Sequence, residues 1–137
     1  MIVVDTNVVA YLLLQGSHTP AAEALLLEHP EWAAPPLWRS ECRNVLAGAL
    51  RRGDLSITQA LALQEQAERH VIVHEEGVQS ERVLQLVASS RCSAFNCEFV
   101  AAAQQLGVPL ITADRALLDA FPAVAQPLPV RTGRRCC

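Results

Sequence analysis

Short apolar runs alternate along the chain with longer segments of helical periodicity. The first run, residues 1–4, ends at Asp5-Thr6-Asn7 and predicts a buried strand that leads directly into a helix. Further strands are predicted at residues 31–34, 71–73 and 108–112, with an edge strand at 124–128. Helices are predicted at residues 8–14, 19–28, 37–52, 57–69, 78–89 and 95–106, with a short one after Asp114 that ends near residue 120.

This alternation predicts an α/β fold with three layers, α/β/α, in which helices cover both faces of a largely parallel central sheet. The 137 residues suit a single domain, expected over residues 1–131, with residues 132–137 as a frayed tail. In such sheets, ligands lie beyond the carboxyl ends of the strands, and candidate chemistry is sought there.

Composition narrows the functional classes. About half of the residues are apolar, but no apolar run is long enough to span a bilayer, and the N-terminus lacks a basic segment typical of a signal peptide, so a cytoplasmic location is expected. The net charge of −3 argues against nucleic-acid binding by global electrostatics. All 11 basic residues are arginine, which excludes any mechanism that depends on lysine.

The cysteines show no spacing typical of a zinc site or of a disulfide framework. Cys42 and Cys97 are expected to act as small apolar residues on helices, and Cys136 and Cys137 to lie in the loose tail.

Carboxylates follow two of the predicted strands. Asp5 comes after the first strand and Asp114 after the fourth, so both should lie at the same edge of the sheet. Each could equally be the N-cap of the next helix. Glu41 borders the apolar stripe of its helix, where a carboxylate needs a cation or a hydrogen-bond donor, such as a metal ion, Arg43 or Arg115.

Two polar residues, Asn96 and Glu98, open the helix before the fourth strand. Asn96 could cap that helix, with Glu98 favoured in its first turn by the helix dipole. Taken together with the carboxylates, these residues form a set of hard oxygen ligands suited to Mg²⁺ or Mn²⁺. Metal-assisted hydrolysis of a phosphodiester is the reaction class that fits this set.

Four sequence segments resemble, in order, the motifs of the PIN-domain family. They are VVDTNV at residues 3–8, PPLWRSECRNVL at 35–46, SAFNCEFVA at 93–101 and PLITADR at 109–115. The resemblance extends from residue 1 to about residue 128, and within the family the chain looks most like a VapC-type toxin of a toxin–antitoxin pair.

The resemblance implies a PIN-like α/β/α fold and an endoribonuclease that depends on Mg²⁺ or Mn²⁺ and cuts an RNA substrate. It also implies a homodimer held inactive by a cognate antitoxin protein, with no membrane partner. By position in the motifs, the implied catalytic residues are Asp5, Glu41, Asn96 and Asp114, the implied metal ligands are Asp5, Asn96 and Asp114, and the implied supporting residues are Thr6, Asn44, Thr112 and Arg115.

One position departs from the family pattern. The family usually carries Tyr-Asp where this chain has Phe95-Asn96, so one carboxylate is replaced by a neutral amide that should weaken metal binding. Two hypotheses therefore remain open: a nuclease of reduced activity, or a catalytically impaired PIN fold that acts as a binding partner. Glu98 could supply the missing charge only if the helix start were irregular, because two residues correspond to about 200° of rotation.

An aspartate after the first strand is also found in haloacid-dehalogenase-like phosphatases and response-regulator receivers. Those families rely on a lysine, which this chain lacks, and the phosphatases carry a second aspartate where this chain has Asn7.

RNA contacts would have to come from local arginines, namely Arg39, Arg43, Arg51 and Arg52 on one helix and Arg115 beside Asp114. Apolar residues on the helices at 21–27 and 37–50 suggest a surface for a second copy or an antitoxin.

Overall fold

Five parallel strands form the central sheet, in the order β3-β2-β1-β4-β5. The computed structural model describes residues 1–74 and 76–129. The strands are β1 (Ile2–Val4), β2 (Trp32–Ala34), β3 (Val71–Val73), β4 (Leu110–Thr112) and β5 (Ala125–Pro127). Strand β1 is central, since Val3 is in register with Ala33 of β2 on one side and Leu110 of β4 on the other. All of the predicted strands, including the edge strand, are therefore confirmed.

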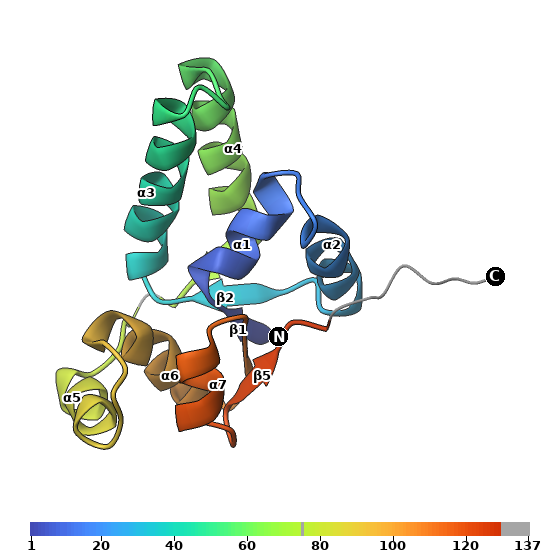
Figure 1. Cartoon of the computed structure of the whole chain (residues 1–137). Helices are drawn as coiled ribbons and strands as arrows, with labels where there is room; N and C mark the ends of the chain where they lie inside the picture. The colour runs from blue at the N-terminus through green and yellow to red at the C-terminus, as the bar shows by residue number, and fades with distance from the viewer. Residues whose placement is uncertain (75, 130–137) are drawn as a thin grey trace.

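Helices cover both faces of this sheet, which confirms the three-layer prediction. Figure 1 shows α1, α3 and α4 packed together on one side, with α2 beside α1, and α5, α6 and α7 on the other side. The helices are α1 (Thr6–Leu13), α2 (Thr19–Glu28), α3 (Leu37–Arg51), α4 (Ile57–His70), α5 (Ser80–Ala88), α6 (Ala94–Leu106) and α7 (Arg115–Ala120).

The core lies between the sheet and the two helical layers. Every residue of β1, β2 and β4 is buried, and the large side chains of Trp32, Trp38 and Phe99 are almost fully enclosed. A buried strand with apolar residues on both faces is typical of a parallel sheet covered on both sides. The strands β1 and β4, which Asp5 and Asp114 follow, are thus enclosed by the core.

Local signals in the sequence explain most of the helix boundaries. Ser56 and Gln59 form the predicted capping box at the start of α4, with reciprocal hydrogen bonds of 3.1 and 2.8 Å. Gly107 ends α6 with a φ of 69°, a left-handed conformation that glycine adopts without steric cost. Helix α1 begins two residues earlier than predicted, at Thr6, because Asp5 caps it directly.

Cysteines 42, 92 and 97 are buried free thiols, which confirms the prediction for Cys42 and Cys97. Burial raises the pKa of the Cys42 thiol to about 11, so this thiol stays protonated. The expected tail at residues 132–137, with Cys136 and Cys137, lies outside the described residues. Within the described part of the chain, no helix has the length and apolar character needed to cross a membrane.

Candidate functional site

Asp5 lies at the carboxyl end of the central strand β1 and is buried, with 7% of its surface exposed. Its Oδ1 accepts a hydrogen bond from the backbone N–H of Val8 at 3.1 Å, so Asp5 is the N-cap of α1. Its Oδ2 accepts a hydrogen bond from the Thr112 hydroxyl at the end of β4. Asp5 is therefore both the N-cap of α1 and a carboxylate predicted for the site, so the two interpretations are compatible.

Asp114 follows β4 and caps α7 in the same way. Its Oδ1 accepts from the backbone N–H of Ala116 at 2.8 Å, and its own N–H donates to the Thr112 hydroxyl at 2.9 Å. Thr112 thus hydrogen bonds to both aspartates, one through its proton and one through its oxygen. The structure brings Asp5, Thr112 and Asp114 together at the carboxyl edge of the sheet, as predicted.

Asn96 joins this group from α6. Its Nδ2 donates a hydrogen bond to Asp114 Oδ2 at 3.1 Å. The expectation that Asn96 caps α6 is wrong, because Ser93 is the N-cap and its hydroxyl accepts from the Asn96 backbone N–H at 3.1 Å. Asn96 therefore lies in the first turn, where its side chain is free to face Asp114.

The environment of Asp5 disfavours its charged form. Burial raises the pKa of Asp5, and the nearby charge of Asp114 raises it further, while the hydrogen bonds from Thr112 and Val8 act in the opposite direction. A buried carboxylate beside another carboxylate is the arrangement that a bound cation would stabilise.

Glu41 lies on α3, half buried, and accepts a hydrogen bond from the Thr6 hydroxyl at 2.7 Å. The partner that the sequence required for Glu41 is thus a hydroxyl. Neither Arg43 nor Arg115 fills this role, since the ion pairs of the described residues join Arg52 to Asp54 and Arg69 to Glu65. Thr6 links Glu41 to the Asp5 group through the chain, because it follows Asp5 directly.

Glu98 lies near Glu41 although α6 is regular from its first residue. Burial raises the pKa of Glu98, and the charge of Glu41 raises it further. Glu98 is in the second turn of α6, so the expected first-turn dipole role does not apply. The carboxylates therefore gather as two pairs, Asp5 with Asp114 and Glu41 with Glu98.

The donor set fits a magnesium or manganese ion held by few protein ligands. Among residues 1–74 and 76–129, no three His, Cys, Asp or Glu side chains gather closely enough to bind one ion. Mg²⁺, however, is commonly held by one or two carboxylates and retains several waters. Asp5 and Asp114 supply two carboxylates, and the Asn96 amide, whose nitrogen bonds Asp114, leaves its carbonyl oxygen as a third hard donor.

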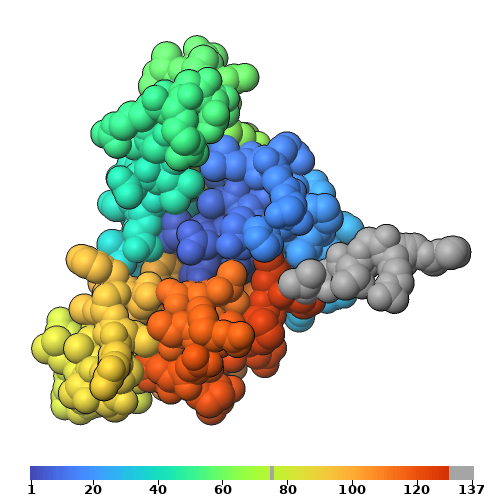
Figure 2. Space-filling model, viewed as in Figure 1, coloured from blue at the N-terminus to red at the C-terminus, as the bar shows by residue number. Residues whose placement is uncertain are grey.

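A cavity of about 400 Å³ adjoins Glu41. On the face shown in Figure 2, the blue start of α1, the cyan start of α3 and the gold start of α6 adjoin one another. Polar residues from α1 and α3 line the cavity, and they include two of the predicted residues around Glu41, Thr6 and Asn44. The lining residues are Thr6, Asn7, Ser40, Glu41 and Asn44, with Leu37, Val45 and Phe95 as apolar walls.

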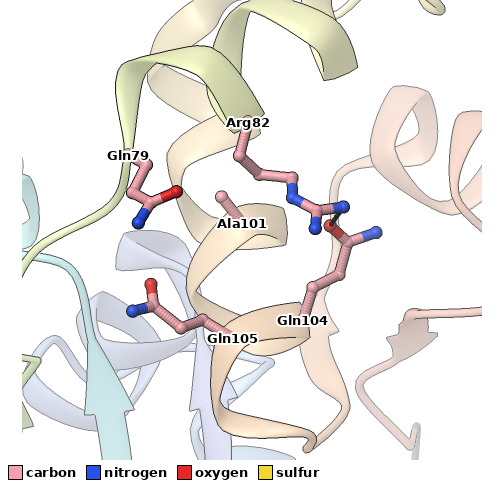
Figure 3. Close-up of a pocket in the computed structure, with 5 residues that line it drawn as sticks. All are labelled: Gln79, Arg82, Ala101, Gln104 and Gln105. Atoms are coloured by element: carbon pink, nitrogen blue, oxygen red, sulfur yellow. Dashed lines mark hydrogen bonds between the residues drawn. The ribbon is translucent and has the colours of Figure 1, made fainter.

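A smaller cavity of about 150 Å³ lies between α5 and α6 (Figure 3). Arg82 donates a long hydrogen bond of 3.5 Å to Gln104 at its edge, and Gln79, Ala101 and Gln105 complete the lining. None of the predicted site residues lines this cavity, so it is not the candidate site.

Arg115 is the first residue of α7, exposed and adjacent to Asp114 in sequence, and it forms no ion pair with another described residue. Among the arginines of α3, Arg52 pairs with Asp54 at 2.9 Å, and Arg51 lies in the last turn, where it complements the helix dipole.

Sequence reasoning missed two residues of this region. Ser93 caps the helix that carries Asn96, and its position three residues before Asn96 was an available signal. Phe95 is 59% exposed and lines the cavity beside Glu41. Helical periodicity places Phe95 with the buried Phe99, four residues on, and therefore gave no indication of its exposure.

A parallel sheet between helical layers, with carboxylates at its carboxyl edge, defines an α/β protein built around a candidate cation site. The family model described as "PIN domain" matches residues 2–122, and the chain belongs to this family. No curated protein matches the chain significantly.

Several solved structures have the same fold. A toxin–antitoxin complex from Klebsiella pneumoniae is similar at 19% identity and a TM-score of 0.66, covering 92% of this chain and 96% of that chain. VapC20 from Mycobacterium tuberculosis, a toxin that cleaves the sarcin-ricin loop, is similar at 19% identity and a TM-score of 0.63, covering 88% and 95%. FitAcB from Neisseria gonorrhoeae is similar at 18% identity and a TM-score of 0.68, covering 91% and 96%.

Proposed function

We propose that this chain is a divalent-metal-dependent endoribonuclease that acts as the toxin of a toxin–antitoxin pair. The observation that carries the proposal is the convergence of Asp5, Asp114 and Asn96 around Thr112 at the carboxyl ends of β1 and β4. Membership of the PIN family supports the nuclease assignment, and the similarity in fold to toxin chains supports the toxin role.

Asp5, Asp114 and the carbonyl oxygen of Asn96 would hold Mg²⁺ or Mn²⁺. When bound, such an ion supplies activation of a water and stabilisation of charge on a phosphoryl oxygen. The protein itself positions these ligands: the Thr112 hydroxyl fixes the orientation of Asp5, and the backbone N–H of Ala116 fixes that of Asp114.

Glu41 has a separate role in this proposal. Its Oε1 is held by Thr6, and it lines the cavity where a substrate would lie. In this proposal Glu41 would accept, at Oε2, a proton from the water that attacks the phosphorus atom. The exposed guanidinium of Arg115, next to Asp114, would contact a substrate phosphate through charge-assisted hydrogen bonds.

The proposed partners are a second copy of the chain and an antitoxin protein. On the side of the sheet covered by α1 to α4, the helices α2 and α4 carry exposed large hydrophobic side chains, namely Leu27, Ile57 and Leu61. On α3, Trp38 and Leu46 are buried, whereas Leu37, Val45 and Leu50 are partly exposed, so α3 offers less apolar surface than α2 and α4. Light scattering of the purified protein tests the homodimer.

The test of function is cleavage of a panel of structured RNAs by the purified protein, with Mn²⁺, with Mg²⁺ and with EDTA. Asp5→Asn is the inactive variant, and Asp119→Asn, an exposed carboxylate on α7, is its matched control. Cutting that requires a metal, is lost in Asp5→Asn and persists in Asp119→Asn is the expected result. If no preparation cuts above the Asp5→Asn level, the alternative gains: a PIN fold whose Asn96 has replaced a catalytic carboxylate and that functions as a binding partner.

A further inference from the structure

We propose that the cavity beside Glu41 binds one unpaired base of single-stranded RNA, stacked on Phe95. This inference rests on the proposed function, because it concerns how the same site holds its substrate.

Phe95 is the one exposed aromatic residue of the chain, whose aromatic residues all lie in the described part. Trp32, Trp38 and Phe99 are at most 1% exposed, whereas Phe95 is 59% exposed. Tyr11 and Phe121 are half buried, and Tyr11 stacks on His18, with ring centroids 4.4 Å apart. A single exposed apolar side chain is ordinary by itself, so its place on the surface decides whether it has a role.

The place of Phe95 is the edge of the site. It precedes Asn96, whose amide donates to Asp114, and its ring lines the cavity that Glu41 also lines. The volume of about 400 Å³ lies within the range of roughly 300–1,000 Å³ that is typical of small-molecule sites. The aromatic ring therefore borders a cavity of ligand size and belongs to the residue next to Asn96, which bonds Asp114.

The remaining walls of the cavity suit a nucleobase. Leu37 and Val45 provide apolar surface, and the carboxamides of Asn7 and Asn44, both exposed, form no side-chain hydrogen bond to another described residue. Carboxamides pair with the edge of a base through one donor and one acceptor, as asparagine does with adenine. The cavity thus combines a stacking surface with unpaired groups that can bond a base edge.

Stacking of a base on an exposed aromatic side chain is also compatible with the negative net charge of this chain. The net charge of −3 gives little attraction for a phosphate backbone. Single-stranded RNA is recognised by stacking of unpaired bases on aromatic residues, which does not require a basic surface. A base held against Phe95 would keep its neighbouring phosphate near Asn96 and Asp114.

The test is binding of short single-stranded RNAs that carry 2-aminopurine, measured in an Asp5→Asn background so that no RNA is cut. Phe95→Ala is compared with Phe95→Tyr and Phe95→Trp, which keep an aromatic ring, and with Phe95→Leu, which keeps only apolar bulk. Leu61→Ala, which truncates an equally exposed residue on α4, is the matched control.

Phe95→Ala and Phe95→Leu are expected to weaken binding on the order of tenfold and to abolish the quenching of 2-aminopurine, while the aromatic variants and Leu61→Ala retain both. If RNA binds Asp5→Asn and Asp5→Asn/Phe95→Ala equally, the base pocket is overturned, and metal-dependent cleavage by the unmutated chain would leave the proposed function standing. Absence of both RNA binding and cleavage in the unmutated chain overturns both. A change in molar mass by light scattering in Phe95→Ala also overturns the pocket, since Phe95 would then pack against a second copy.

Discussion

The hydroxyl of Thr112 donates its proton to the carboxylate of Asp5 and, on the same oxygen, accepts the backbone N–H of Asp114 at 2.9 Å. One side chain at the end of β4 therefore fixes both aspartates at the carboxyl edge of the sheet. Because Thr112 is fully buried, neither of its hydrogen bonds can be replaced by bulk water.

Thr112→Val is expected to lower the free energy of unfolding by about 1–3 kcal/mol, because it leaves a buried carboxylate oxygen and a backbone N–H without this partner. Thr112→Ser keeps the hydroxyl and should lose far less. Urea unfolding of the two variants in EDTA measures the difference. Equal stabilities for valine and serine at this position would show that the hydroxyl contributes nothing to the folded state.

Asn96→Asp is expected to have opposite effects without and with metal. Without metal, it replaces an amide donor by a second carboxylate facing Asp114 and should lower the melting temperature. With Mn²⁺, the added charge should tighten metal binding by about tenfold, which corresponds to about 1.4 kcal/mol, and should increase cleavage. Thermal melts in EDTA and across a Mn²⁺ titration measure both effects.

The control for Asn96→Asp is Gln66→Glu, which adds the same charge to the exposed face of α4. It should change neither the melt in EDTA nor the response to Mn²⁺. An Asn96→Asp protein that is more stable than the unmutated chain in EDTA would contradict the hydrogen bond from the Asn96 amide to Asp114.

The sequence was sufficient for the positions of the strands along the chain and for the convergence of Asp5 and Asp114, since buried apolar runs and the rules of parallel sheets determine both. The strand order in the sheet, β3-β2-β1-β4-β5, was not predicted. The motifs also named Asn96 as a site residue, but the sequence was insufficient for the hydrogen bond of Asn96 to Asp114 and for the exposure of Phe95. Both depend on where the first turn of α6 faces, and that follows from the packing of α6 against β1 and β4 and from the Ser93 cap, which periodicity alone does not reveal. The proximity of Glu98 to Glu41 was likewise not predictable, because it joins two helices separated by more than 40 residues and by two helices and one strand of the fold.

The stability of the metal-free protein is expected to depend on pH through Asp5. The pKa of Asp5 is raised above its ordinary value of 3.8, mainly by burial, so the folded state binds the proton more tightly than the unfolded state. The stabilisation from this proton is complete below pH 3.8 and is lost as the pH rises through the raised value. Asp5→Asn has no such loss and should gain stability relative to the unmutated chain as the pH rises toward neutral.

Unfolding free energies of the unmutated chain and Asp5→Asn, measured in EDTA at several pH values, test this expectation. Asp119→Asn, whose carboxylate is exposed, should show a difference that is nearly constant over the same range. If the difference in unfolding free energy between Asp5→Asn and the unmutated chain does not vary with pH, the charged form of Asp5 does not destabilise the folded state.

Glu98→Gln is expected to stabilise the metal-free protein at neutral pH. The pKa of Glu98 is raised by burial and by the charge of Glu41, so its ionised form opposes folding above the ordinary value of 4.5. Glu65→Gln on α4, which removes an exposed carboxylate paired with Arg69, is the control and should have little effect or a small destabilising one. The response to Mn²⁺ tests whether Glu98 also contributes to metal binding. Because its charged neighbour is Glu41 and not the Asp5–Asp114 pair, Glu98→Gln should reduce metal-induced stabilisation much less than Asp5→Asn does. A loss as large as that of Asp5→Asn would instead make Glu98 the replacement for the carboxylate that Asn96 lacks.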